Sequence, residues 1–287
     1  MRSPKLASVA VLLSLLSAAS DGAMRPQAPR SMSESIQPND AAPLDTSRLA
    51  LVIGNSAYPD ADFPLPQITS DAEALTNSLR EDGFLVDAIE NTTRLGMTRA
   101  IDHLKNRLRS NSTVLVYFGG YGIQSDGQNY LIPIDATIWS EEDVRRQGVS
   151  LDRLLLQLRD SGARVRLAVI EASRRNPYER RFRTYSHGLA PIRLPVNALV
   201  LSSAGPSEVV EDSEGLHSQL ISALLVQMET SREIEEVFSN TRNAVVAATR
   251  GQQIPVVLST LTESFHLSRA QIGAPAYSVG SAISGHR

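Results

Sequence analysis

The sequence predicts a single α/β domain, an open α/β/α sandwich around a mostly parallel sheet. Short apolar runs alternate with stretches whose apolar residues recur at helical spacing, which is typical of strand–helix–strand units. The clearest run, residues 165–170, is nearly continuous in β-branched and aliphatic residues, as expected for a strand covered by helices on both faces. It breaks into the polar segment 171–177. Ligand sites in such sheets lie at the carboxyl ends of strands, so this edge is where we expect function.

The other elements follow in chain order. A strand over residues 48–53 precedes a proline-containing loop and a helix that opens at Asp71 and stops at Gly83. Residues 133–150 show neither the helical nor the strand spacing of apolar residues and are predicted to be a loop. The remaining expected elements are the strands 84–89, 114–118, 130–132, 165–170 and 198–202, and the helices 97–108, 151–159, 216–228 and 233–248.

The two ends of the chain have a different character. Residues 1–23 combine basic residues, an apolar run and small residues in the order of a secretory signal peptide, so we expect export to a periplasmic or extracellular location. The run is shorter than the roughly 20 apolar residues that a spanning helix needs, which predicts no permanent membrane anchor. Residues 24–47 are expected to be a disordered linker and residues 269–287 a flexible tail, leaving 48–268 as the folded domain.

Composition excludes several classes of function. A hydrophobic content of 42% and a charged content of 21% are typical of a globular domain. The net charge of −3 and the scattered basic residues give no reason to expect nucleic acid as a partner. The chain has no cysteine, which removes disulfides, thiolate metal sites and a cysteine nucleophile. The acidic run 141–143 raises the alternative of calcium, but we interpret it as surface charge and predict no metal and no cofactor.

Several blocks of the sequence match a known family in content and order. Together they resemble bacterial caspase-like peptidases of the metacaspase and orthocaspase type, over nearly the whole predicted domain. The resemblance implies a caspase-like α/β/α sandwich and cysteine endopeptidase activity from a histidine–cysteine dyad. The blocks that carry it are residues 51–58, 70–72, 117–124, 129–136, 171–177, 188–190 and 251–255.

By this resemblance both dyad positions are replaced, the histidine by Tyr121 and the cysteine by Ser173. A serine hydroxyl is not ionised at neutral pH and needs an adjacent base to act as a nucleophile. A phenol, with an ordinary pKa of about 10, is a poor base near pH 7. The paired loss predicts an inactive pseudoprotease rather than a peptidase.

The resemblance also assigns acidic residues to the pocket that selects an Arg or Lys side chain. Asp71 and Glu171 fall on two such positions, and Asp212 is a third candidate. Paired carboxylate oxygens accept the N–H fork of a guanidinium, so the expected partner is a peptide or protein with exposed Arg or Lys. A second caspase-like protein is the other partner considered. For Asp71 the alternative is structural, because an acid at a helix start caps the helix whatever the function.

Two rival functions stay open. The first is a weak serine peptidase in which Ser173 recruits His187 or His217 as its base. The second is an adaptor whose cleft is irrelevant to binding. The arginine-rich run 174–183 is interpreted as a solvated loop, with docking of this segment into the acidic pocket as the alternative.

Overall fold

The computed structural model describes residues 47–61, 64–182, 187–211 and 215–267. Its main sheet has the strand order β2-β1-β3-β7-β8-β9, in which the first five strands are parallel and β9 is antiparallel. A small antiparallel sheet has the order β4-β5-β6. The main strands are β1 (Arg48–Gly54), β2 (Leu85–Glu90), β3 (Thr113–Gly119), β7 (Val165–Glu171), β8 (Ala198–Ser202) and β9 (Val256–Ser259), and the small ones are β4 (Gly122–Ser125), β5 (Gln128–Leu131) and β6 (Val149–Ser150).

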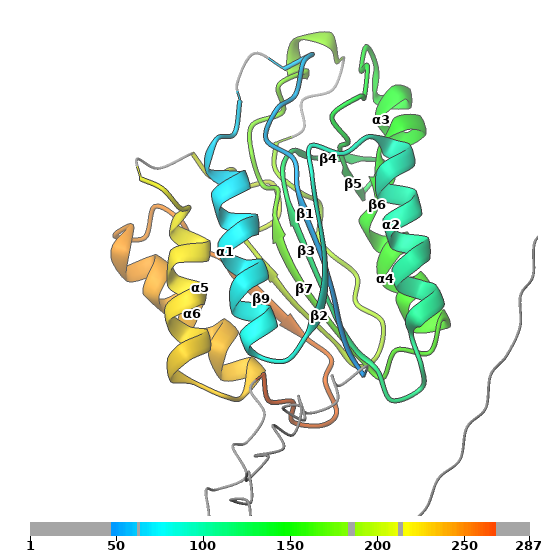
Figure 1. The fold of residues 1–287 in the computed structure, drawn as a ribbon. Helices are drawn as coiled ribbons and strands as arrows, with labels where there is room; N and C mark the ends of the chain where they lie inside the picture. Colours follow the sequence, from blue (N-terminus) through cyan, green and yellow to red (C-terminus); the bar gives the residue numbers. More distant parts are fainter. Residues whose placement is uncertain (1–46, 62–63, 183–186, 212–214, 268–287) are drawn as a thin grey trace, which may run out of the picture. The chain divides into compact units, whose positions relative to one another are not determined.

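Helices cover both faces of the main sheet, which confirms the predicted α/β/α sandwich (Figure 1). One face packs against α1, α5 and α6, and the other against α2 and α4, because side chains alternate between the faces along each strand. Every residue of β3 and β7 is buried, as the apolar runs predict. The helices are α1 (Gln67–Glu81), α2 (Arg94–Arg107), α3 (Glu141–Gln147), α4 (Leu151–Asp160), α5 (Gln219–Thr230) and α6 (Ile234–Ala248).

The register of the central strands places the polar segments side by side. Gly119 at the end of β3 pairs with Glu171 at the end of β7 in a parallel ladder. The segments that follow the two strands therefore leave the same edge of the sheet. Tyr121 and Ser173, the two residues that the resemblance assigns to the dyad positions, each lie two residues beyond that pair.

Four elements differ from the prediction. Helix α1 begins at Gln67, four residues before Asp71, so Asp71 lies in its second turn and does not cap it. The residues that precede Asp71 are polar or β-branched, so they give no sequence signal for the start of the helix. The segment predicted as a loop contains α3, whose seven residues are too few to show a helical period. The edge strands β4 and β9 were also missed because each is only four residues long.

The predicted signal peptide, most of the linker and the tail lie outside the described residues. In the described part, the longest helices have 15 residues, and no helix is long and apolar enough to cross a membrane.

Candidate functional site

Tyr121 sits in the turn between β3 and β4 and is buried, with 3% of its surface exposed. Its ring packs edge-on against Tyr58, with the ring centroids 4.9 Å apart. The Tyr58 hydroxyl accepts a hydrogen bond from the Tyr121 backbone N–H (3.1 Å) and donates one to the carbonyl of Ile132 (2.9 Å). A side chain at Gly120, whose φ is +154°, would collide with that hydroxyl. The turn is thus built around a tyrosine pair.

Ser173 follows the end of β7 and is fully buried. Its carbonyl accepts a hydrogen bond from the backbone N–H of Val210 (2.7 Å), which fixes the segment. Among the described residues, no group forms a hydrogen bond with the Ser173 Oγ. Within the described part of the chain, the hydroxyl therefore has no base in hydrogen-bond contact, and it is closed to solvent.

Glu171 ends β7 and lies at the centre of a buried polar cluster, with 3% of its surface exposed. Its Oε2 accepts a hydrogen bond from the Tyr117 hydroxyl (2.9 Å), and its Oε1 lies 3.6 Å from Nη2 of Arg174. Arg174 Nη1 donates to the carbonyls of Glu171 (2.6 Å) and Gly120 (3.3 Å). Burial raises the pKa of Glu171 to about 7, although the positive charge of Arg174 opposes the shift.

Asp71 is the second buried carboxylate, with none of its surface exposed. Its Oδ1 lies 2.9 Å from Nδ1 of His217, and both carboxylate oxygens accept from the backbone N–H of Ser218 at 3.2 Å. Ser218 is also the N-cap of α5, so Asp71 ties α1 to the start of α5. Burial raises the pKa of Asp71, against the lowering effect of the Ser218 N–H and of His217.

The two predicted acidic positions belong to one electrostatic cluster, because the negative charge of Asp71 contributes to the raised pKa of Glu171. Asp212, the third candidate, lies outside the described residues. The interpretation of the arginine run as a solvated loop is wrong for Arg174, which is 6% exposed and contacts Glu171. It is also wrong for Arg181, which binds Asp60 (2.8 Å).

Sequence reasoning missed three contributors to this site. Tyr58 and Tyr117 look like packing residues in the sequence, yet each uses its hydroxyl in the buried network. Ser218 is the third, and its only sequence signal is the preference of serine for helix N-caps. In the acidic run of α3, Asp143 accepts from the Trp139 backbone N–H (3.1 Å) and the Ser140 hydroxyl (3.0 Å), which is a structural role.

The two candidate histidine bases make other contacts. His217 binds Asp71 through Nδ1. His187 Nδ1 lies 3.7 Å from a carboxylate oxygen of Glu179, and the His187 carbonyl accepts from the side chain of Gln124 (2.8 Å). In the described part of the chain, neither histidine forms a hydrogen bond with Ser173. The structure thus does not assemble a serine–histidine pair.

A cleft opens beside Tyr121, with a volume of about 510 Å³. This volume lies within the usual range for ligand sites of roughly 300–1,000 Å³. Its lining includes the buried side chain of Arg174 and that of Val209, which is 36% exposed. The lining residues are Leu65, Tyr121, Arg174, Arg175, Asn176, Pro177, Glu179, Arg180, Val209, Val210 and Glu211.

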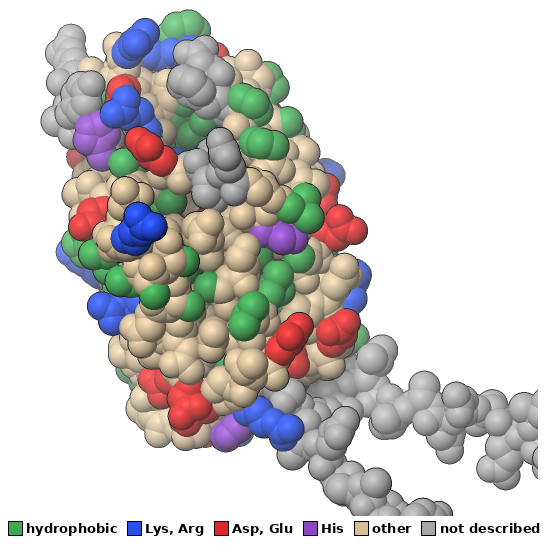
Figure 2. Space-filling view, turned by 90° about the vertical axis from the view of Figure 1, so that its left-hand side faces the viewer, with side chains coloured by type: hydrophobic (Ala, Val, Ile, Leu, Met, Phe, Trp, Pro, Cys, Tyr) green, Lys and Arg blue, Asp and Glu red, His purple; other side chains and the backbone are tan. Residues whose placement is uncertain are grey.

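The surface that carries α5 and α6 has charges of both signs interspersed with single apolar side chains (Figure 2). Among the described residues of that face, the view shows no broad basic region. Nor does the described part of the chain contain a group of three or more His, Asp or Glu residues placed to hold a metal ion.

A mostly parallel sheet between two helical layers, with a buried polar cluster at the adjacent ends of β3 and β7, defines a caspase-like fold. The chain belongs to the caspase domain family, whose model matches residues 47–266.

Two curated proteins are similar to it. The mouse mucosa-associated lymphoid tissue lymphoma translocation protein 1 homolog is 27% identical over 247 residues, which are 81% of this chain and 28% of the mouse protein. The human mucosa-associated lymphoid tissue lymphoma translocation protein 1 is 33% identical over 97 residues, or 33% of this chain and 11% of the human protein. The chain thus spans less than a third of the length of either relative.

Proposed function

We propose that this protein is an exported, catalytically inactive caspase-fold protein that binds a basic peptide segment in the cleft beside Tyr121 without cutting it. The observation that carries the proposal is the state of Ser173, whose hydroxyl is buried and lacks a hydrogen-bond partner among the described residues. A serine nucleophile needs a base within about 3 Å and access to the scissile carbonyl.

Tyr121 does not replace the missing base. Its ring is packed against Tyr58, and its backbone is fixed by the Tyr58 hydroxyl. Even an exposed phenol, with a pKa of about 10, would be almost entirely protonated at pH 7. The weak serine peptidase is therefore the less favoured function, because it requires His187 or His217 to leave a carboxylate and approach a buried hydroxyl.

The preference for a basic ligand rests on the buried carboxylates. Burial raises the pKa of Glu171 and of Asp71 because it destabilises their charged forms, so a guanidinium or ammonium group brought close to them is favoured. Arg174, which lines the cleft and contacts Glu171, shows that a guanidinium fits beside this carboxylate. A visiting basic side chain would take the place of the Arg174 guanidinium.

Peptide binding by the full-length protein tests the proposal. Fluorescence anisotropy of a labelled peptide with one central Arg should show saturable binding, and replacement of that Arg by norleucine should weaken it about tenfold, as expected for loss of a charge-assisted hydrogen bond. Glu171→Gln should also weaken it, whereas Glu73→Gln, an exposed residue of α1, should not. Equal affinity for the Arg and norleucine peptides would contradict the proposed ligand.

A second candidate partner, another caspase-like chain, has its own support. Strand β9 ends the main sheet, and within the described residues it pairs only with β8. An edge strand with unpaired backbone groups can add a strand from another chain. This adaptor function predicts that Asp71→Ala and Glu171→Ala leave partner binding intact, whereas a proline at Val257 abolishes it.

A further inference from the structure

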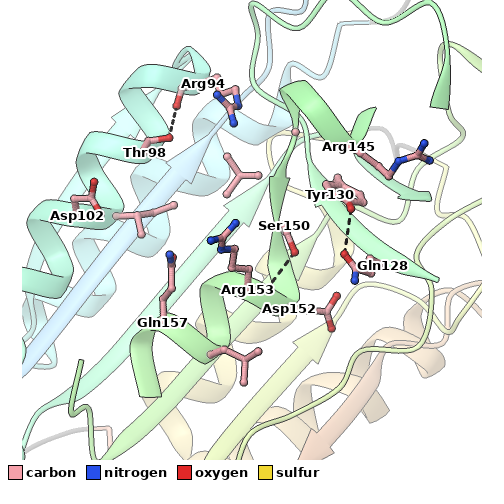
Figure 3. Close-up of a pocket in the computed structure, with 14 residues that line it drawn as sticks. Arg94, Thr98, Asp102, Gln128, Tyr130, Arg145, Ser150, Asp152, Arg153 and Gln157 are labelled. Atoms are coloured by element: carbon pink, nitrogen blue, oxygen red, sulfur yellow. Dashed lines mark hydrogen bonds between the residues drawn. The ribbon is translucent and has the colours of Figure 1, made fainter. Parts of the chain in front are cut away.

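A second hollow lies between α2, α4 and the small sheet (Figure 3). It has a volume of about 490 Å³ and shares no lining residue with the cleft beside Tyr121. Arginines from three different helices line it, namely Arg94 of α2, Arg145 of α3 and Arg153 of α4. We call this hollow the α2/α4 groove.

The charges in the α2/α4 groove do not cancel. Arg145 binds the carboxylate of Asp126 (3.0 Å) and the hydroxyl of Ser125 (2.8 Å). The two acidic residues of the groove also have partners, since Asp102 binds Lys105 (3.0 Å) and Asp152 accepts from a backbone N–H of β5 (3.4 Å).

By contrast, the guanidinium groups of Arg94 and Arg153 have no ion-pair or hydrogen-bond partner among the described residues. In Figure 3 both side chains extend into the groove from its two helical walls. Two guanidinium groups without a direct partner among the described residues therefore line one concave surface, beside the carboxylates of Asp102 and Asp152. Planar guanidinium groups suit phosphate and carboxylate oxygens.

The uncharged part of the lining combines apolar, amide and hydroxyl side chains. Ile101, Val149 and Tyr130 contribute apolar surface, and Leu156 is 42% exposed. The side chain of Gln157 has no hydrogen-bond partner in the described part of the chain and extends toward the groove (Figure 3). A ligand that matches this surface has an anionic group for the arginines and an apolar body for the floor.

We propose that the α2/α4 groove binds a small organic dianion, whose negative charges contact Arg94 and Arg153 and whose apolar body lies against Leu156. The shared chemistry is a phosphomonoester or a dicarboxylate on an apolar body. The site is independent of the proposed peptide cleft.

Isothermal titration calorimetry on the full-length protein at low salt tests the proposal, with phenyl phosphate and isophthalate as dianion probes and benzoate as the singly charged control. At least one dianion should bind saturably, and benzoate should bind about tenfold more weakly. The stronger of the two dianion probes identifies the phosphate or the dicarboxylate as the natural group.

Arg94→Gln and Arg153→Gln should each weaken the stronger probe about tenfold. Arg99→Gln is the matched control, because Arg99 is an exposed residue of α2 outside the groove. All three substitutions are on the surface, and unchanged melting temperatures verify that the variants are folded. Absence of saturable binding at about 10 mM of both probes, or equal weakening by Arg99→Gln, would overturn the proposal.

Discussion

The buried carboxylate of Glu171 makes the stability of this protein depend on pH. Burial raises the pKa of Glu171 to about 7 in the folded state, from 4.5 in an exposed side chain. Between these values the folded state holds a proton that the unfolded state releases, so the free energy of unfolding falls as the pH rises. The stabilisation is fully present below pH 4.5 and is lost as the pH rises through 7.

The size of the effect follows from the two pKa values. One pKa unit corresponds to about 1.36 kcal/mol. Titration of Glu171 therefore lowers the free energy of unfolding by about 2.5 kcal/mol between pH 5 and pH 8. Glu171→Gln removes the titration and keeps an oxygen that accepts the Tyr117 hydroxyl. Burial also raises the pKa of Asp82 to about 6, so Asp82 adds its own pH-dependent loss of stability. This loss is the same in the parent and in Glu171→Gln, and it cancels when the two proteins are compared.

Urea unfolding at pH 5 and pH 8 measures this prediction. The free energy of unfolding of Glu171→Gln, measured relative to the parent, should be higher at pH 8 than at pH 5 by about 2.5 kcal/mol. The matched control is Glu73→Gln, which changes an exposed glutamate of α1 and should leave the pH dependence unaltered. An identical pH dependence in the parent and Glu171→Gln would refute the buried carboxylate cluster.

Three further substitutions probe the same region. Ser173→Ala removes a buried hydroxyl that has no partner in the described structure, so it should raise stability by up to about 1 kcal/mol in thermal unfolding. Tyr58→Phe removes the hydroxyl that accepts from the Tyr121 backbone N–H and donates to the Ile132 carbonyl, and should lower the free energy of unfolding by about 1–3 kcal/mol. An unchanged urea midpoint would contradict this prediction. Arg174→Gln removes the cation beside Glu171 and should lower the free energy of unfolding by about 3 kcal/mol at pH 8 and by less at pH 5. The same variant should bind the arginine peptide more tightly in the anisotropy assay. Weaker binding would show that Arg174 does not compete with the peptide for Glu171.

Much of the fold is predictable from the sequence because the signals are local. The apolar run 165–170 lies wholly within β7, and the rule that parallel strands end at one edge places Tyr121 and Ser173 together. The start predicted for α1 was wrong, because the first turn of the helix shows no periodic pattern of apolar residues and its N-cap, Pro66, makes no side-chain hydrogen bond.

The candidate site was harder to predict because its contacts join distant residues. Tyr117 and Glu171 are separated by 54 positions, and Asp71 and His217 by 146. A pattern of residue types can place both carboxylates near one edge of the sheet. It does not show which hydroxyl, imidazole or guanidinium reaches each one, which depends on how α1, β7 and the start of α5 pack.

The central claim, that the chain keeps a caspase fold without peptidase chemistry, is tested most directly by peptide cleavage. A fluorogenic series with Arg, Lys, Asp or a neutral residue before the bond would be given to the parent, to Ser173→Ala and to the double variant Tyr121→His, Ser173→Cys. We predict no cleavage by the first two proteins and cleavage after Arg or Lys by the third. Cleavage by the parent that disappears in Ser173→Ala would contradict the claim and establish a serine peptidase.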